Sequence, residues 1–93
     1  MKRAFLLLTL CLLNHHVAMA EEFKCVVTDN TGGRHIILID TSDMKDARRA
    51  AAASTVENNF GRSSPVEKIL ECKREKELFT SPRARALDQQ TPR

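Results

Sequence analysis

After residue 20, the sequence begins with two short apolar runs that are separated by a polar segment. Residues 23–28 are rich in side chains that favour β-strands, and residues 35–40 contain four consecutive Ile and Leu side chains. Between them, residues 29–33 include Asn and two glycines, which tolerate the positive φ angles of tight turns. The pattern therefore predicts a β-hairpin.

A helix is predicted after this hairpin, over residues 44–59. The polar residues 41–43 offer N-cap side chains, and residues 50–53 are four consecutive alanines, the best helix formers. Residues 58–61, Asn-Asn-Phe-Gly, provide a C-terminal break. Small or apolar residues recur along one side at helical spacing, which allows close packing against a sheet: Met44, Ala47, Ala51 and Ser54.

Residues 66–73 mix charged and apolar side chains, so they are compatible with a third strand or with a helix that continues through residue 79. The cysteines favour the strand, because Cys25 on strand one and Cys72 on an adjacent strand three can form a disulfide. The expected fold class is α+β. A small ββαβ domain forms a three-stranded antiparallel sheet, in the order 2-1-3, with one helix on a face and one disulfide.

The second predicted strand is apolar at both alternating sets of positions, Ile36 and Leu38 on one face and Ile37 and Ile39 on the other. One helix covers only one face of the sheet, and in the order 2-1-3 this strand is also an edge that can pair with another chain. Either the C-terminal segment or another chain must cover the second face. We therefore expect self-association or docking on a larger partner, with Ile36 and Leu38 as candidate contacts.

The C-terminal segment, residues 79–93, contains two prolines, three arginines and few large apolar side chains. This composition predicts a disordered basic tail. From residue 73 to the C-terminus the net charge is +3. Arg83 and Arg85 are therefore candidate contacts for acidic surfaces or lipid headgroups, although a solubilising tail is the simpler interpretation.

The first 20 residues have the three parts of a secretory signal peptide. Two basic residues follow Met1, residues 4–13 are apolar apart from one threonine, and Ala18 and Ala20 are the small residues that signal peptidase requires before a cut. Cleavage is therefore predicted between Ala20 and Glu21. The predicted organisation is a signal peptide at 1–20, a small exported domain at 21–78 and the tail at 79–93.

Two other interpretations of the N-terminus are weaker. The apolar run is about half as long as a helix that crosses a bilayer. A lipoprotein signal would make Cys11 the first mature residue, but it requires a small residue where Leu10 stands. We therefore expect no transmembrane segment after cleavage.

Cleavage changes the composition on which a functional argument can rest. It leaves 13 basic and 12 acidic residues, a net charge of +1, so the pI of about 9.0 for the whole chain is poor evidence for a nucleic-acid partner. It also leaves two cysteines, Cys25 and Cys72, in an oxidising compartment, where an even number favours a structural disulfide. With His35 as the single remaining histidine, they fall short of a four-ligand zinc site. No metal and no cofactor are expected.

The chain offers little sign of catalysis. His35 stands beside a glycine-rich turn, where we expect a surface residue, and no Ser, His and Asp combination indicates a triad. Residues 30–34 could bind an anion through backbone N–H groups, but a hairpin turn explains the same residues. A Walker phosphate-binding motif is absent, and so are the surface aromatics that stack on nucleic-acid bases.

These observations predict a small, non-enzymatic binding or interaction protein that is exported, in bacteria to the periplasm. Two alternatives stay open. The chain could be a structural accessory of an envelope assembly that docks through the strand edge, or an inhibitor of an exported enzyme that uses loops 29–34 and 61–65 as contacts.

Overall fold

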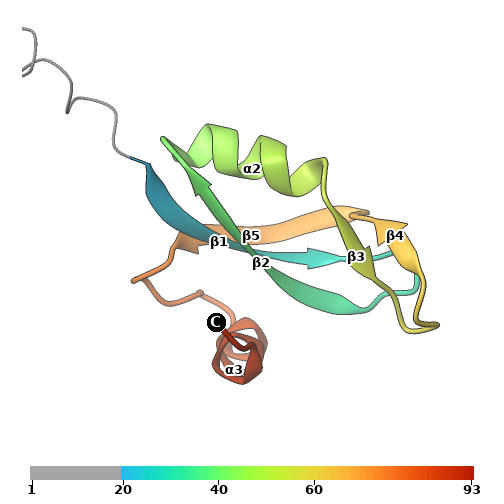
Figure 1. Cartoon of the computed structure of the whole chain (residues 1–93). Helices are drawn as coiled ribbons and strands as arrows, with labels where there is room; N and C mark the ends of the chain where they lie inside the picture. The colour runs from blue at the N-terminus through green and yellow to red at the C-terminus, as the bar shows by residue number, and fades with distance from the viewer. Residues whose placement is uncertain (1–19) are drawn as a thin grey trace, which may run out of the picture.

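The computed structural model describes residues 20–93, and its core is a three-stranded antiparallel sheet (Figure 1). Strands β1 (Glu21–Thr28), β2 (Arg34–Thr41) and β5 (Lys68–Arg74) lie in the order β2-β1-β5. Cys25 lies opposite Cys72 in the β1–β5 ladder, and the two form a disulfide. The predicted hairpin, sheet order and disulfide are confirmed, and a strand rather than a helix follows residue 66.

Helix α2 (Met44–Ala52) covers one face of this sheet. Asp43 is its N-cap, and the Asp43 carboxylate accepts a hydrogen bond from the backbone N–H of Asp46 at 2.8 Å. Ala47 and Ala51 are fully buried, because their small side chains let the helix lie close to the strands. Ala51 packs in a core that also contains the disulfide, with half-buried Ile37 and Ile39 at its margin.

The predicted C-terminal end of this helix is wrong. Helix α2 stops at Ala52, and a second, two-stranded sheet follows, formed by β3 (Thr55–Glu57) and β4 (Ser63–Pro65). The reason lies in the turn between these strands. The Asn58 side chain accepts hydrogen bonds from the backbone N–H groups of Phe60 and Arg62, and Gly61 has a φ of 73°. A tight turn therefore satisfies these polar groups better than a continued helix does.

The prediction of a disordered tail is also wrong, because residues 82–90 form helix α3 (Pro82–Gln90). Ser81 caps this helix, and Pro82 occupies its first turn. The segment contains few apolar residues, but the sheet supplies the other half of the core: Phe79 and Ala84 are buried against Val26. Ile36 and Leu87 pack at the margin of this cluster. The C-terminal segment thus covers part of the face that α2 leaves open. This is the first of the two coverings expected from the sequence, the other being a second chain.

Helices α2 and α3 therefore lie on opposite faces of the sheet, as Figure 1 shows. The predicted signal peptide lies outside the described residues except for Ala20, which is exposed. Glu21, the predicted first mature residue, begins β1. Within residues 20–93, no helix is long and apolar enough to cross a membrane.

Candidate functional site

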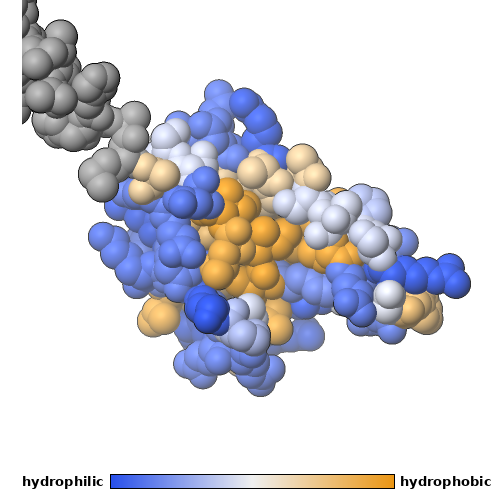
Figure 2. Space-filling view, viewed as in Figure 1, coloured by the Kyte–Doolittle hydropathy of each residue, from blue (hydrophilic) through white to orange (hydrophobic). Residues whose placement is uncertain are grey.

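The outer edge of β2 is the main candidate site. Strand β2 pairs with β1 on one side, and no other strand of residues 20–93 pairs with its other side. Residues 36–39 are all half-buried, because α2 and α3 each cover only part of the side chains on their own face. In Figure 2 a continuous hydrophobic patch lies between the two helices, over the sheet. Unpaired backbone groups and apolar side chains thus occur together at this edge.

The other sheet edge, β5, has two features that disfavour pairing with another chain. Strand β5 carries the charged residues Lys68, Glu71, Lys73 and Arg74 among its seven residues. Its register with β1 also shifts at Val26 and Val27, which leaves Leu70 as the extra residue of a bulge. Charges and bulges are the common means by which edge strands avoid association. Between Arg34 and Asp40, strand β2 has neither feature.

The four residues predicted as contacts have different surroundings. Ile36 packs on the cluster of Val26, Phe79 and Ala84, here called the α3 cluster. Leu38 is half-buried on the same face of β2. Arg85 is used inside the chain, since its guanidinium donates to the carbonyl oxygens of Phe79 and Thr80 at 3.0 and 2.9 Å. Arg83 is exposed and lines a groove of about 370 Å³ between the β1–β2 turn and α3.

Sequence reasoning missed the charges at the two ends of the open edge. Arg34 precedes the apolar run, and Asp40 follows it. Both side chains are exposed, and within residues 20–93 neither forms an ion pair. Arg34 also lines the groove beside Arg83, so this end of the edge is positive. A charged residue at each end of an apolar run is the sequence signal that could have found this pattern.

A buried carboxylate organises the β1–β2 turn, which was another feature missed from the sequence. The Asp29 side chain is fully buried, and its Oδ2 lies 2.6 Å from Nε2 of His35. Its Oδ1 accepts hydrogen bonds from the backbone N–H groups of Thr31 and Gly33 at 2.7 and 3.1 Å. The hydrogen bond with His35, followed by those from Thr31 and Gly33, holds the pKa of Asp29 well below its ordinary value although burial opposes this shift.

This geometry predicts an acid-sensitive turn. A carboxylate whose pKa is lowered by folding stabilises the protein above the ordinary carboxyl range, and this contribution is lost as the pH falls through the folded pKa. We expect Asp29→Asn to lower the melting temperature at pH 7 and to weaken its decline below about pH 4. Thermal unfolding from pH 7 to pH 2 tests this. Glu67→Gln, at an exposed carboxylate outside β2, is the control; an equal effect of both substitutions would contradict the assignment.

The same turn anchors the β3–β4 hairpin. The Asn30 side chain accepts from the Ser64 hydroxyl at 2.8 Å, and the Thr31 hydroxyl accepts from the backbone N–H of Asn59 at 3.3 Å. The hairpin turn then presents Phe60, which is 77 % exposed. An exposed aromatic side chain on an anchored turn is a second candidate protein contact. It lies next to loop 61–65, which the sequence also indicated as a candidate contact.

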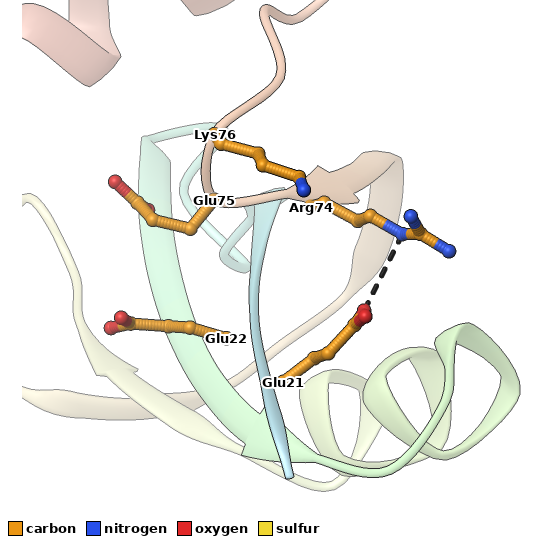
Figure 3. Close-up of a pocket in the computed structure, with 5 residues that line it drawn as sticks. All are labelled: Glu21, Glu22, Arg74, Glu75 and Lys76. Atoms are coloured by element: carbon orange, nitrogen blue, oxygen red, sulfur yellow. Dashed lines mark ion pairs between the residues drawn. The ribbon is translucent and has the colours of Figure 1, made fainter. Parts of the chain in front are cut away.

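A hollow lined by charged residues lies at the other end of the sheet. It encloses about 250 Å³ between the start of β1 and the end of β5. Figure 3 shows that Glu22 and Glu75 lie on one side of β1 and that Glu21 and Arg74 lie on the other, joined by an ion pair of 3.4 Å. Within residues 20–93, no group of three or more His, Cys, Asp or Glu side chains could hold a metal ion. The charged side chains around this hollow therefore do not form a metal site. They lie at the surface, beside the predicted mature N-terminus.

Comparison with known proteins identifies the family of this chain. A family model described as "Type IVa secretion system protein TapY2-like" matches residues 4–93, which is nearly the whole chain. The chain belongs to this family. No curated protein and no solved structure is detectably similar to it.

Membership of the TapY2-like family associates this small protein with a secretion system. It supports an association with the cell envelope and with other proteins.

Proposed function

We propose that the mature chain is a non-enzymatic, periplasmic accessory protein of a type IVa secretion system and that the outer edge of β2 is its protein-binding surface. The open edge carries this proposal. It combines unpaired strand backbone with half-exposed apolar side chains at four consecutive positions. The TapY2-like family membership supplies the secretion-system context.

The physical argument is strand addition. An extended segment of another chain can hydrogen-bond to the free N–H and C=O groups of an edge strand, and the side chains on both faces add specificity. Burial of the apolar residues 36–39 by the added strand stabilises such a complex, at roughly 25 cal/mol for each Å² of apolar surface removed from water. The charged and bulged β5 edge lacks these properties.

A photo-crosslinking residue placed at each edge strand tests the assignment. Benzoylphenylalanine replaces Leu38 on β2 in one variant and Leu70 on β5 in the other, and both are expressed with the signal peptide in the native host. We expect light to crosslink the Leu38 variant to a protein of the secretion system. A crosslink to a second copy of this chain also counts as such a result. We expect the Leu70 variant to give little or no adduct, although Leu70 is 38 % exposed.

A third position separates the second candidate function from the first. The exposed Phe60 on the β3–β4 turn favours an inhibitor-like contact through the loops. Adducts from benzoylphenylalanine at Phe60, with none from Leu38, would support that candidate and reject β2 as the binding edge. Each variant must first show the melting temperature of the unmodified protein, so that a misfolded chain is not scored as a lost contact.

A further inference from the structure

We infer that the occupant of the β2 edge is a second copy of this chain, paired antiparallel through a twofold axis at Ile37. The inference rests on the proposed function, because it names the partner of the same edge. It concerns the residues of β2 and their charges alone.

Symmetry restricts the registers that two β2 strands can adopt. Residues opposite each other in an antiparallel ladder point to the same face of the sheet. In a twofold-symmetric pair, residue i of one copy faces residue j of the other, and residue j of the first copy faces residue i of the second. Because facing residues point to the same face, i and j also point to the same face of one strand. One residue must therefore lie opposite its own copy, and the axis lies midway between these two copies. Within the apolar run, the central choices are Ile37 and Leu38.

The charges select Ile37. With the axis at Ile37, Ile36 lies opposite Leu38 of the second copy, and Arg34 lies opposite its Asp40. With the axis at Leu38, the carboxylate of Asp40 would instead lie opposite Ile36. Only the first register places a positive charge against a negative charge and leaves neither Arg34 nor Asp40 opposite an apolar residue. By symmetry, it forms the Arg34–Asp40 pair at both ends of the interface. On the other face of the sheet this register places His35, whose ring is held by the Asp29 carboxylate, opposite Ile39 of the second copy.

The structure leaves these charges available. Arg34 and Asp40 are exposed, and neither has an ion-pair partner within residues 20–93. They lie on the α3 face of β2, as does Ile36, which packs on the α3 cluster. Arg83 lines the groove with Arg34, so a carboxylate that arrives from a second copy meets a locally positive surface.

The resulting dimer also leaves no apolar edge strand of the main sheet open to pairing with a further chain. Two sheets would join into one sheet of six strands, in the order β5-β1-β2-β2-β1-β5, with the same surface used by both copies. Its two outer edges are the β5 strands, whose charges and bulge resist further pairing. Association through β2 thus ends at a closed dimer.

A charge swap tests the inference on the purified, oxidised mature chain. Sedimentation equilibrium is expected to show a dimer for the unmodified protein. Arg34→Asp and Asp40→Arg each place like charges opposite each other twice, and we expect each to weaken dimerisation about tenfold or more. The double variant Arg34→Asp with Asp40→Arg restores opposite charges, and we expect its dimerisation constant to return close to that of the unmodified chain.

Arg62→Asp is the matched control, since it changes the net charge by the same amount as Arg34→Asp, at an exposed arginine on the β3–β4 turn. It should leave the dimer unchanged. Circular dichroism melting of every variant confirms that the fold is retained. A monomer up to millimolar concentration overturns the inference, and so does a double variant that is as weak as the single variants. If the chain is monomeric but the Leu38 crosslinker captures a different secretion-system protein, the proposed function stands and the second copy is rejected.

Discussion

We expect reduction of the Cys25–Cys72 disulfide to lower the melting temperature of the mature chain by roughly 20 °C. The bond joins β1 to β5 across a sequence separation of 47 residues, and both cysteines lie in the main core. Constraining a loop of this length in the unfolded chain stabilises the folded state by about 4 kcal/mol in the chain-entropy model. A domain this small has a total stability of only about 5 kcal/mol. Thermal melts followed by circular dichroism, with and without reductant, measure the change.

The variant Cys25→Ala with Cys72→Ala is the control for this measurement. Alanine avoids placing a hydroxyl group in a site where Cys25 is fully buried. The double variant should melt near the temperature of the reduced protein, and reductant should not change it further. A shift of less than about 5 °C on reduction would show that the sheet and the two helices hold the fold without the bond.

The second large effect is expected at Lys24, which is only 3 % exposed. Its ammonium lies 2.7 Å from the Asp88 carboxylate and 5.0 Å from the centre of the Phe79 ring. Asp88→Ala would leave this ammonium buried without a counter-ion, which costs about 3 kcal/mol. Because the pair joins β1 to α3, we expect faster amide hydrogen exchange over residues 82–90 as well as a lower midpoint of urea unfolding.

A double-mutant cycle separates the ion pair from simple packing. Lys24→Met keeps an apolar chain beside Phe79, so the variant Lys24→Met with Asp88→Ala should recover most of the stability lost by Asp88→Ala alone. An additive loss in the double variant would contradict a coupled pair. The pKa of Asp88 agrees with the geometry: burial alone raises it, but the hydrogen bonds from Lys24 and Arg93 outweigh burial and lower it.

The Lys24–Asp88 pair also bears on the proposed binding edge. Helix α3 covers the face of β2 that carries Ile36, and it stops short of covering the whole apolar run. If α3 were released, more of that face would be exposed and pairing would lose its defined geometry. Stability of the C-terminal helix is therefore a condition for an edge that binds a partner in one register.

Local patterns in the sequence determined the central part of the fold. Two β-rich runs around a turn with Asn30 and two glycines predicted the hairpin of β1 and β2, and the alanine-rich segment predicted α2, because turn chemistry and helix propensity act over a few residues. The pairing of Cys25 with Cys72 then fixed the place of β5 beside β1, since a disulfide requires neighbouring backbones. The apolar side chains on both faces of the second strand also indicated that a second covering element was required.

Tertiary contacts decided the rest. Residues 79–93 are too polar to form a core alone, and they fold because Val26 and Ile36 supply the opposite apolar surface and Lys24 supplies a counter-charge for Asp88. Helix α2 ends early because the Asn58 turn and its contacts with the β1–β2 turn hold residues 55–65 as a hairpin. The open edge of β2 likewise depends on how far α2 and α3 reach across the sheet. These features arise from residues far apart in the sequence, so no local pattern specifies them.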